Sequence, residues 1–227
     1  MRDKNLITTG LLDYEHPVVR ELHASLAARC TTKLDYLRTA HRHIVASVLP
    51  VYSLDEHQPV SDTLAKQRGS CSQRMACLEA LARAHGIPTR VRALWVKGRF
   101  WRRRFPYVHL FFPKRVLLLW PEFFLDGQWL SFEELHAPVR RLATENRRPF
   151  KNDTETLFEA IETQAVDFFG RSTGAQRDCA PTDLSSWVVE DSLYFATRDD
   201  ALAQYGSLHH SVRGRIFHCI FGDRRSV

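Results

Sequence analysis

The chain has 227 residues, of which 44% are hydrophobic and 26% charged, and both values are ordinary for a soluble globular protein. No apolar run reaches the length needed to span a membrane, which argues against a membrane protein. The net charge of +6 and the sequence pI of about 9.2 favour an acidic or phosphate-bearing partner over a basic one.

The five cysteines are irregularly spaced and include no CxxC pair, so they predict neither a zinc site nor a disulfide framework. The first ten residues, MRDKNLITTG, lack the apolar segment of a secretory signal. We therefore expect a reducing, cytoplasmic setting with no membrane association. No cofactor and no metal ion are expected either.

Two helices are predicted at the start of the chain, over residues 17–30 and 33–48, with Pro50 ending the second. A polar connection over 51–66 follows. The predicted strands are Val91–Val96, Tyr107–Phe112, Arg115–Leu119, Pro121–Leu125 and Trp129–Phe132. Helical patterning returns at 154–169 and 198–205, and a loop is expected over 170–186.

A helix that begins at a Gly-Ser-Cys turn lies between these two groups. Its apolar residues fall at helical spacing, and Arg74, Glu79 and Arg83 lie largely off the apolar stripe. Gly86 and Pro88 are predicted to end the helix. Cys71 thus stands at a helix N-terminus, where unpaired N–H groups and the helix dipole lower the pKa of a thiol and make it a usable nucleophile. The alternative is a half-buried structural cysteine.

The order of helices, a meander of strands and further helices predicts an α+β fold with an antiparallel sheet. We expect a core over residues 1–136, in which the cysteine helix packs on the sheet, and a helical and loop extension over 137–227. The extension is predicted to pack on the core, so that the chain forms one globular unit.

Four short motifs follow one another between residues 68 and 129. Residues 68–71 read Arg-Gly-Ser-Cys, and residues 86–90 read Gly-Ile-Pro-Thr-Arg. Residues 118–122 read Leu-Leu-Trp-Pro-Glu, and residues 126–129 read Asp-Gly-Gln-Trp. These motifs resemble those of the transglutaminase-like superfamily, a branch of the papain-like cysteine enzymes, which has His-x-Trp-x-Glu in the position of residues 118–122. The resemblance covers residues 34 to 134 and implies a cysteine, histidine and carboxylate triad with a papain-like core.

The family's histidine position holds Leu118, which cannot move a proton. A hairpin centred on Pro113-Lys114 would place His109 directly opposite Leu118, on the same face of the sheet. Alternatively, residues 110–119 are an insertion and His109 is the family histidine itself. Both routes nominate His109 as the base, against the alternative of a strand histidine without chemistry.

The family's aspartate position holds Glu133, which would orient the imidazole and stabilise its charged form. The other candidates for oxyanion or substrate binding are Gln67, Ser70, Trp120, Glu122 and Asp126. Each has a simpler structural role open to it. Gln67 would be a surface residue, Ser70 a helix cap, Trp120 a core residue, Glu122 a partner of Arg90 or Arg92, and Asp126 a turn residue.

The remaining histidines are weaker candidates for a catalytic role. His41 and His43 are predicted at the surface of the second helix, and His136 is a reserve candidate for the base. The residues His209, His210 and His218 fit no common metal site.

The basic partner-binding residues are expected to be Arg99, Arg102, Arg103 and Arg104, which alternate with aromatic residues in the loop 97–105. The leading hypothesis is thiol-dependent acyl transfer or amide or peptide processing through a Cys71 thioester. Its substrate would be a small molecule, a peptide or an acyl group on an acidic carrier protein. The alternatives are a binding module that has lost its chemistry, and a nucleic-acid binder that uses the basic loop.

Overall fold

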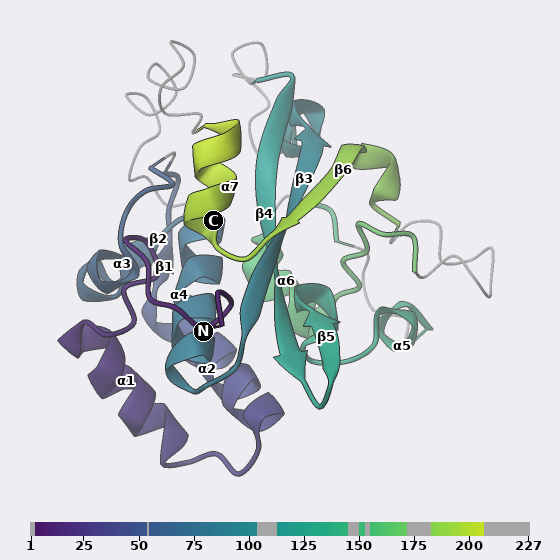
Figure 1. The fold of residues 1–227 in the computed structure, drawn as a ribbon. Coiled ribbons are helices and arrows are strands. Elements are labelled where there is room, and N and C mark those ends of the chain that lie inside the picture. Colours follow the sequence, from purple (N-terminus) through teal and green to yellow (C-terminus); the bar gives the residue numbers. More distant parts are fainter. Residues whose placement is uncertain are drawn as a thin grey trace.

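The computed structural model of this chain describes residues 3–53, 55–103, 113–144, 150–152, 155–171 and 183–206. Helices come first, three strands of an antiparallel sheet follow, and two further helices precede the last strand and the last helix of the described part (Figure 1). The predicted α+β class is confirmed.

Four helices form the first half of the fold, and they are α1 (Pro17–Ala27), α2 (Lys33–Ser47), α3 (Val60–Lys66) and α4 (Cys71–Ala84). The first three gather around α4 on one side of the sheet (Figure 1). Because α4 is enclosed on all sides, its polar residues Arg74, Glu79 and Arg83 are buried as well. Their position off the apolar stripe therefore does not place them in solvent.

The four-stranded sheet has the order β5-β4-β3-β6, with every neighbouring pair antiparallel. The strands are β3 (Thr89–Lys97), β4 (Arg115–Leu125), β5 (Gln128–Ser131) and β6 (Val188–Phe195). Two predicted strands on either side of Trp120 are in fact one strand, β4. The β4–β5 ladder starts at Glu122, so Pro121 lies just outside it, where a missing N–H costs least.

Strand β6 was not predicted, yet it forms an edge of the sheet against β3. It belongs to the second half of the described chain, with α5 (Val139–Thr144), α6 (Leu157–Thr163) and α7 (Arg198–Tyr205). Phe158 of α6 and Leu202 of α7 lie in the same buried cluster as Leu37 of α2 and Leu94 of β3. The division of the chain at residue 136 stays a prediction.

Short elements connect these parts. They are the parallel pair β1 (Leu49–Pro50) and β2 (Arg68–Gly69) and the 3₁₀ helices η1 (Gly98–Trp101), η2 (Phe132–Glu134) and η4 (Ser185–Trp187). Gly69 is required here for its size, because a Cβ atom would lie 2.8 Å from Thr63 Cγ2. Gly86 follows α4 with φ of 71°, the left-handed conformation typical of a helix C-terminus.

Within the described ranges, no helix is both long and apolar enough to cross a lipid bilayer.

Candidate active site

Cys71 is the first residue of α4, and a reciprocal capping box fixes the backbone around it. The Ser70 Oγ accepts a hydrogen bond from the Gln73 backbone N–H at 3.2 Å, and the Gln73 Oε1 accepts one from the Ser70 N–H at 2.8 Å. Cys71 itself is half-buried and packs against the main core cluster. Ser70 is thus the helix cap that the sequence suggested, and the thiol stands at a rigid helix start.

The first turn of α4 is held by the segment that follows β1. Gln73 Nε2 donates to the Asp55 carbonyl at 2.8 Å, and Ser72 Oγ donates to Glu56 Oε2 at 2.5 Å. Burial of the Glu56 carboxyl raises its pKa, against the opposing effect of the Ser72 hydrogen bond. The residues on either side of Cys71 are therefore committed to structural contacts.

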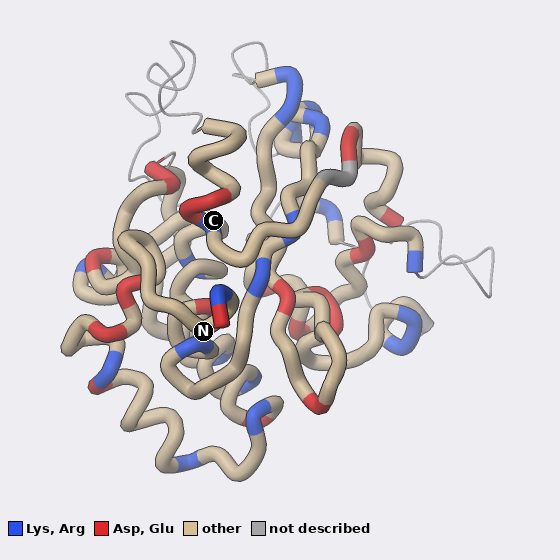
Figure 2. The backbone as a smooth tube through the Cα atoms, viewed as in Figure 1, with Lys and Arg blue, Asp and Glu red and all other residues tan. Residues whose placement is uncertain are grey.

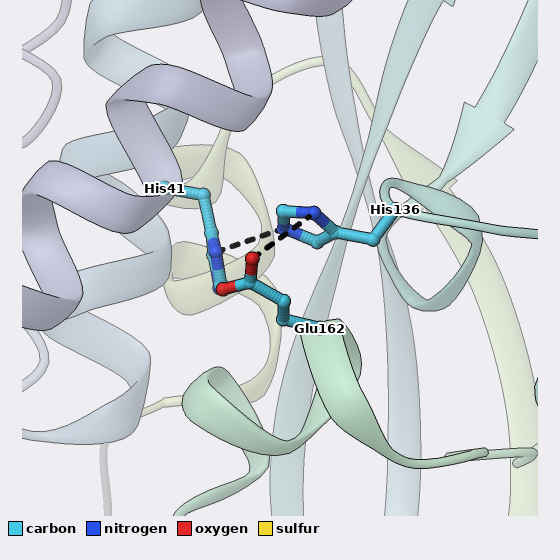
Figure 3. A group of neighbouring side chains, drawn as sticks. All are labelled: His41, His136 and Glu162. Atoms are coloured by element: carbon cyan, nitrogen blue, oxygen red, sulfur yellow. Dashed lines mark hydrogen bonds and ion pairs between the residues drawn. The ribbon is translucent and has the colours of Figure 1, made fainter.

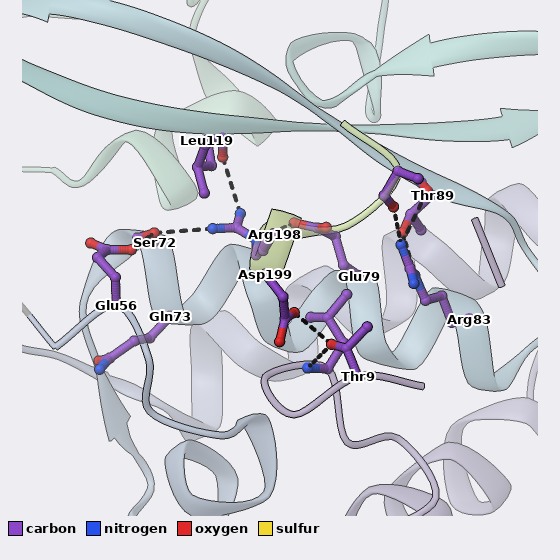
Figure 4. Close-up of polar contacts among 12 residues, drawn as sticks. Thr9, Glu56, Ser72, Gln73, Glu79, Arg83, Thr89, Leu119, Arg198 and Asp199 are labelled. Atoms are coloured by element: carbon purple, nitrogen blue, oxygen red, sulfur yellow. Dashed lines mark hydrogen bonds and ion pairs between the residues drawn. The ribbon is translucent and has the colours of Figure 1, made fainter. Parts of the chain in front are cut away.

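Arg198, from the start of α7, reaches into this region and is almost fully buried (Figure 4). Its Nε lies 2.6 Å from Glu79 Oε1, its Nη1 donates to Ser72 Oγ at 3.1 Å, and its Nη2 donates to the Leu119 carbonyl at 3.0 Å. Arg198 thus brings a positive charge to the residue next to Cys71. Arg198 is not among the predicted site residues, because an arginine at the start of a short polar helix has the pattern of a surface residue.

Glu133 lies in η2 and is 1% exposed. Its Oε2 accepts hydrogen bonds from Trp120 Nε1 at 2.5 Å and from Ser131 Oγ. Its Oε1 lies 3.1 Å from Arg171 Nη1, an ion pair that lacks hydrogen-bond geometry, and has no hydrogen-bond donor among the described residues. Burial raises the pKa of Glu133 to about 7, while the two hydrogen bonds and Arg171 act in the opposite direction.

Leu118, at the family's histidine position, is a core residue of β4 with 6% exposure. It pairs with Leu94 of β3, in a ladder that aligns residues 89–97 with 115–123. The predicted strand Tyr107–Phe112 and His109 lie outside the described residues, so the proposed partnership of His109 with Cys71 stays a prediction.

The other candidates have structural roles. Gln67 ends α3 in the left-handed conformation and is exposed. Trp120 is fully buried. Glu122 is buried and pairs with Arg90 directly across the sheet, with Arg90 Nη2 at 2.6 Å from Glu122 Oε2. Asp126 has φ of 49° and forms the two-residue turn between β4 and β5. These contacts match the simpler role suggested for each residue.

Basic residues gather where β3 ends and β4 begins (Figure 2). Arg99, Arg102 and Arg103 are exposed there, and Arg104 lies outside the described residues. Exposed arginines suit an acidic protein and a nucleic acid equally well.

His136, the reserve candidate for the base, is engaged elsewhere. Its Nε2 lies 3.0 Å from Nδ1 of His41, and its Nδ1 lies 3.9 Å from Glu162 Oε1. His41 is fully buried, so its predicted place at the helix surface is wrong. The reason is that α6 covers this side of α2, with the Phe158 carbonyl at 2.7 Å from His41 Nε2.

Comparison with known proteins relates this chain to one family. A crystal structure of a candidate cysteine protease from Cytophaga hutchinsonii is similar, with 16% sequence identity and a TM-score of 0.44. The likeness covers 56% of this chain and 39% of that one, so the chain spans well under half of its neighbour. No curated protein matches the sequence. The profile of the transglutaminase-like superfamily matches residues 20–134, just over half of the chain, and the chain belongs to this superfamily.

Proposed function

We propose that the protein is a thiol-dependent enzyme that transfers or hydrolyses an acyl group through a thioester on Cys71. The observation that carries this proposal is the place of Cys71, at the capped start of a central helix in a chain of this superfamily. The helix start favours the thiolate, and Arg198, which is paired with Glu79, helps to hold the neighbouring Ser72 in place.

Two further groups complete the proposed machinery. His109 would act as the base, since Leu118 cannot. Glu133 would orient the imidazole through Oε1, the buried oxygen that has no hydrogen-bond donor among the described residues. Because Trp120 and Ser131 hold the other oxygen, the carboxylate has a fixed direction in which to accept an imidazole N–H.

The reaction would run in two balanced steps. The Cys71 thiolate attacks the acyl carbon, a C–S bond forms, and the leaving amine or thiol takes a proton from the His109 imidazolium. Water or an acceptor amine then attacks the thioester, gives its proton to His109 and releases Cys71 as the thiolate.

The proposed substrate is a small molecule, a peptide or an acyl group on a carrier protein. An acidic carrier would be attracted to the exposed side chains of Arg99, Arg102 and Arg103. This attraction would weaken with ionic strength, so the KM for such a substrate would rise with added salt while kcat stays constant.

The test is the rate of iodoacetamide alkylation of Cys71 as a function of pH, followed by mass spectrometry of the Cys71 peptide. We expect an apparent pKa at least ~1 unit below the ~8.5 of an ordinary thiol, because the helix start and an imidazolium stabilise the thiolate. Cys30, which is also half-buried, serves as the internal control thiol. His109→Ala should return the pKa of Cys71 toward the ordinary value, and His85→Ala should not.

The competing function is a binding module of the same fold, and the observation that favours it is the buried Leu118 at the family's histidine position. It predicts that Cys71 titrates near 8.5 and that His109→Ala changes nothing. Either result would count against the enzyme.

A further inference from the structure

Three side chains from distant parts of the chain meet beside α2 (Figure 3). His41 comes from α2, His136 from the segment after η2, and Glu162 from α6. One ligand atom from each residue lies within 4.8 Å of the ligand atoms of the other two. His41 is fully buried, the His136 side chain is 6% exposed and that of Glu162 is 30% exposed.

The backbone fixes the proton on His41. Its Nε2 lies 2.7 Å from the Phe158 carbonyl, which can only accept, so Nε2 must carry the hydrogen. Nδ1 of His41 therefore presents a lone pair toward His136. A histidine whose outer nitrogen is held by a carbonyl is the usual arrangement for a metal ligand.

The His136 backbone is also held in place. Arg38 Nε donates to the Leu135 carbonyl at 2.9 Å, and Arg38 Nη2 donates to the His136 carbonyl at 3.1 Å. The distance of 3.0 Å between His41 Nδ1 and His136 Nε2 is close to the ~3.3 Å that separates two donors on a tetrahedral zinc ion with bonds of ~2.05 Å. A small increase in the distance between these two nitrogens would admit the ion.

Three positive charges oppose a cation at this place, since Arg38 and Arg74 as well as Arg42 lie near the two histidines. Arg42 Nε lies 2.6 Å from Glu162 Oε1 and neutralises part of the carboxylate charge. A metal ion has to compete with this ion pair, but Arg42 is 59% exposed and can move into solvent at little cost. We therefore expect roughly micromolar affinity, weaker than that of closed sites with four protein ligands.

We propose that His41, His136 and Glu162 form a binding site for a divalent transition-metal ion of the zinc class. Two imidazoles and one carboxylate are a donor set that suits such ions and leaves a coordination position for water. The bound ion would link α2 to α6. His136 and Glu162 lie beyond residues 20–134, so two of the three ligands come from outside the part that matches the superfamily, and the site does not depend on the chemistry of Cys71.

The test uses the full chain, stripped of metal with a chelator, and Zn²⁺ in competition with a chelating dye. We expect one Zn²⁺ per chain and a higher melting temperature of the loaded protein. His136→Ala and Glu162→Gln should each weaken binding ~100-fold, since loss of an outer-shell contact alone costs 10–100-fold. Glu162 is half-buried, so this second variant keeps the test valid if His136→Ala unfolds.

The matched control is the pair His23 and His85, whose Nε2 and Nδ1 lie 3.3 Å apart. His85→Gln should leave Zn²⁺ affinity unchanged. The absorption spectrum of the Co²⁺ form should show nitrogen and oxygen ligands without thiolate charge transfer, and Cys71→Ser should not alter it. The proposal is overturned if no saturable site is found, if Glu162→Gln binds as tightly as the wild type, or if the Co²⁺ spectrum reports a thiolate.

Discussion

Glu133, the carboxylate of the proposed catalytic machinery, also affects the stability of the fold. It is an acid enclosed in protein, and its pKa is raised from the ordinary 4.5 to about 7 because burial disfavours the charged form. Between these two pH values the folded chain holds a proton that the unfolded chain has released. The free energy of unfolding must therefore fall as the pH rises through this window.

Replacing Glu133 by glutamine removes this titration. We expect the stability of Glu133→Gln relative to the wild type to rise by roughly 3 kcal/mol between pH 4.5 and pH 7.5, since a shift of one pKa unit corresponds to about 1.4 kcal/mol. Urea unfolding of both proteins across this range measures the difference. A pH-independent difference would contradict the raised pKa.

Ser131→Ala should change the pKa of Glu133 without removing its carboxyl group. The Ser131 hydroxyl bonds to Glu133 Oε2 and stabilises the charged carboxylate. Without this bond the pKa of Glu133 should rise further, and the loss of stability should extend to higher pH.

At the scale of single elements, the capping box of α4 has two roles, since it stabilises the helix and fixes the backbone at Cys71. Ser70→Ala should lower the free energy of unfolding by about 1 kcal/mol. It should also lower the alkylation rate of Cys71 relative to that of Cys30. Thr32, which caps α2 through the Asp35 N–H, offers a matched control. Thr32→Ala should cost a similar amount of stability, as measured by thermal unfolding, and leave Cys71 reactivity unchanged. Equal effects of both variants on the thiol would contradict a positioning role.

The elements that local sequence determines were predictable. The start of α4 at Cys71, its end before Gly86 and the turn at Asp126 all follow from residues within a few positions of each boundary. Strand β6 was not predictable in the same way. Its register is set by pairing with β3, about a hundred residues earlier, and its own sequence carries exposed apolar residues such as Leu193 with no clear alternation.

The metal-site candidate was missed for a related reason. His41 lies at helical spacing with Leu37 and Ile44 on the buried face of α2, and that pattern was visible in the sequence. What the pattern could not reveal is the partner, because Glu162 belongs to a helix far along the chain. Likewise, the spacing around Leu118 nominates His109 as the base, but local sequence does not determine whether that imidazole reaches Cys71.

Over the whole molecule, the second half of the chain completes the core built by the first. Arg83 of α4 donates to the Ala196 carbonyl at 2.6 Å, and Thr9 donates to Asp199 Oδ2 at 2.6 Å (Figure 4). A further contact of this kind is the ion pair between Arg198 and Glu79, in which both charges are buried. If these contacts stabilise the fold, residues 183–206 are required for folding.

The pair of Arg198 with Glu79 allows this dependence to be measured. Arg198→Met leaves the Glu79 carboxylate buried without its cation and should cost about 3–5 kcal/mol in urea unfolding. Adding Glu79→Leu removes the unpaired charge, so the double variant should be more stable than Arg198→Met alone. Arg42→Met, which breaks an ion pair of the same 2.6 Å length at an exposed arginine, should cost no more than about 1 kcal/mol. Equal costs for the two single variants would mean that α7 is not integrated into the core, because only a buried pair leaves a charge that water cannot reach.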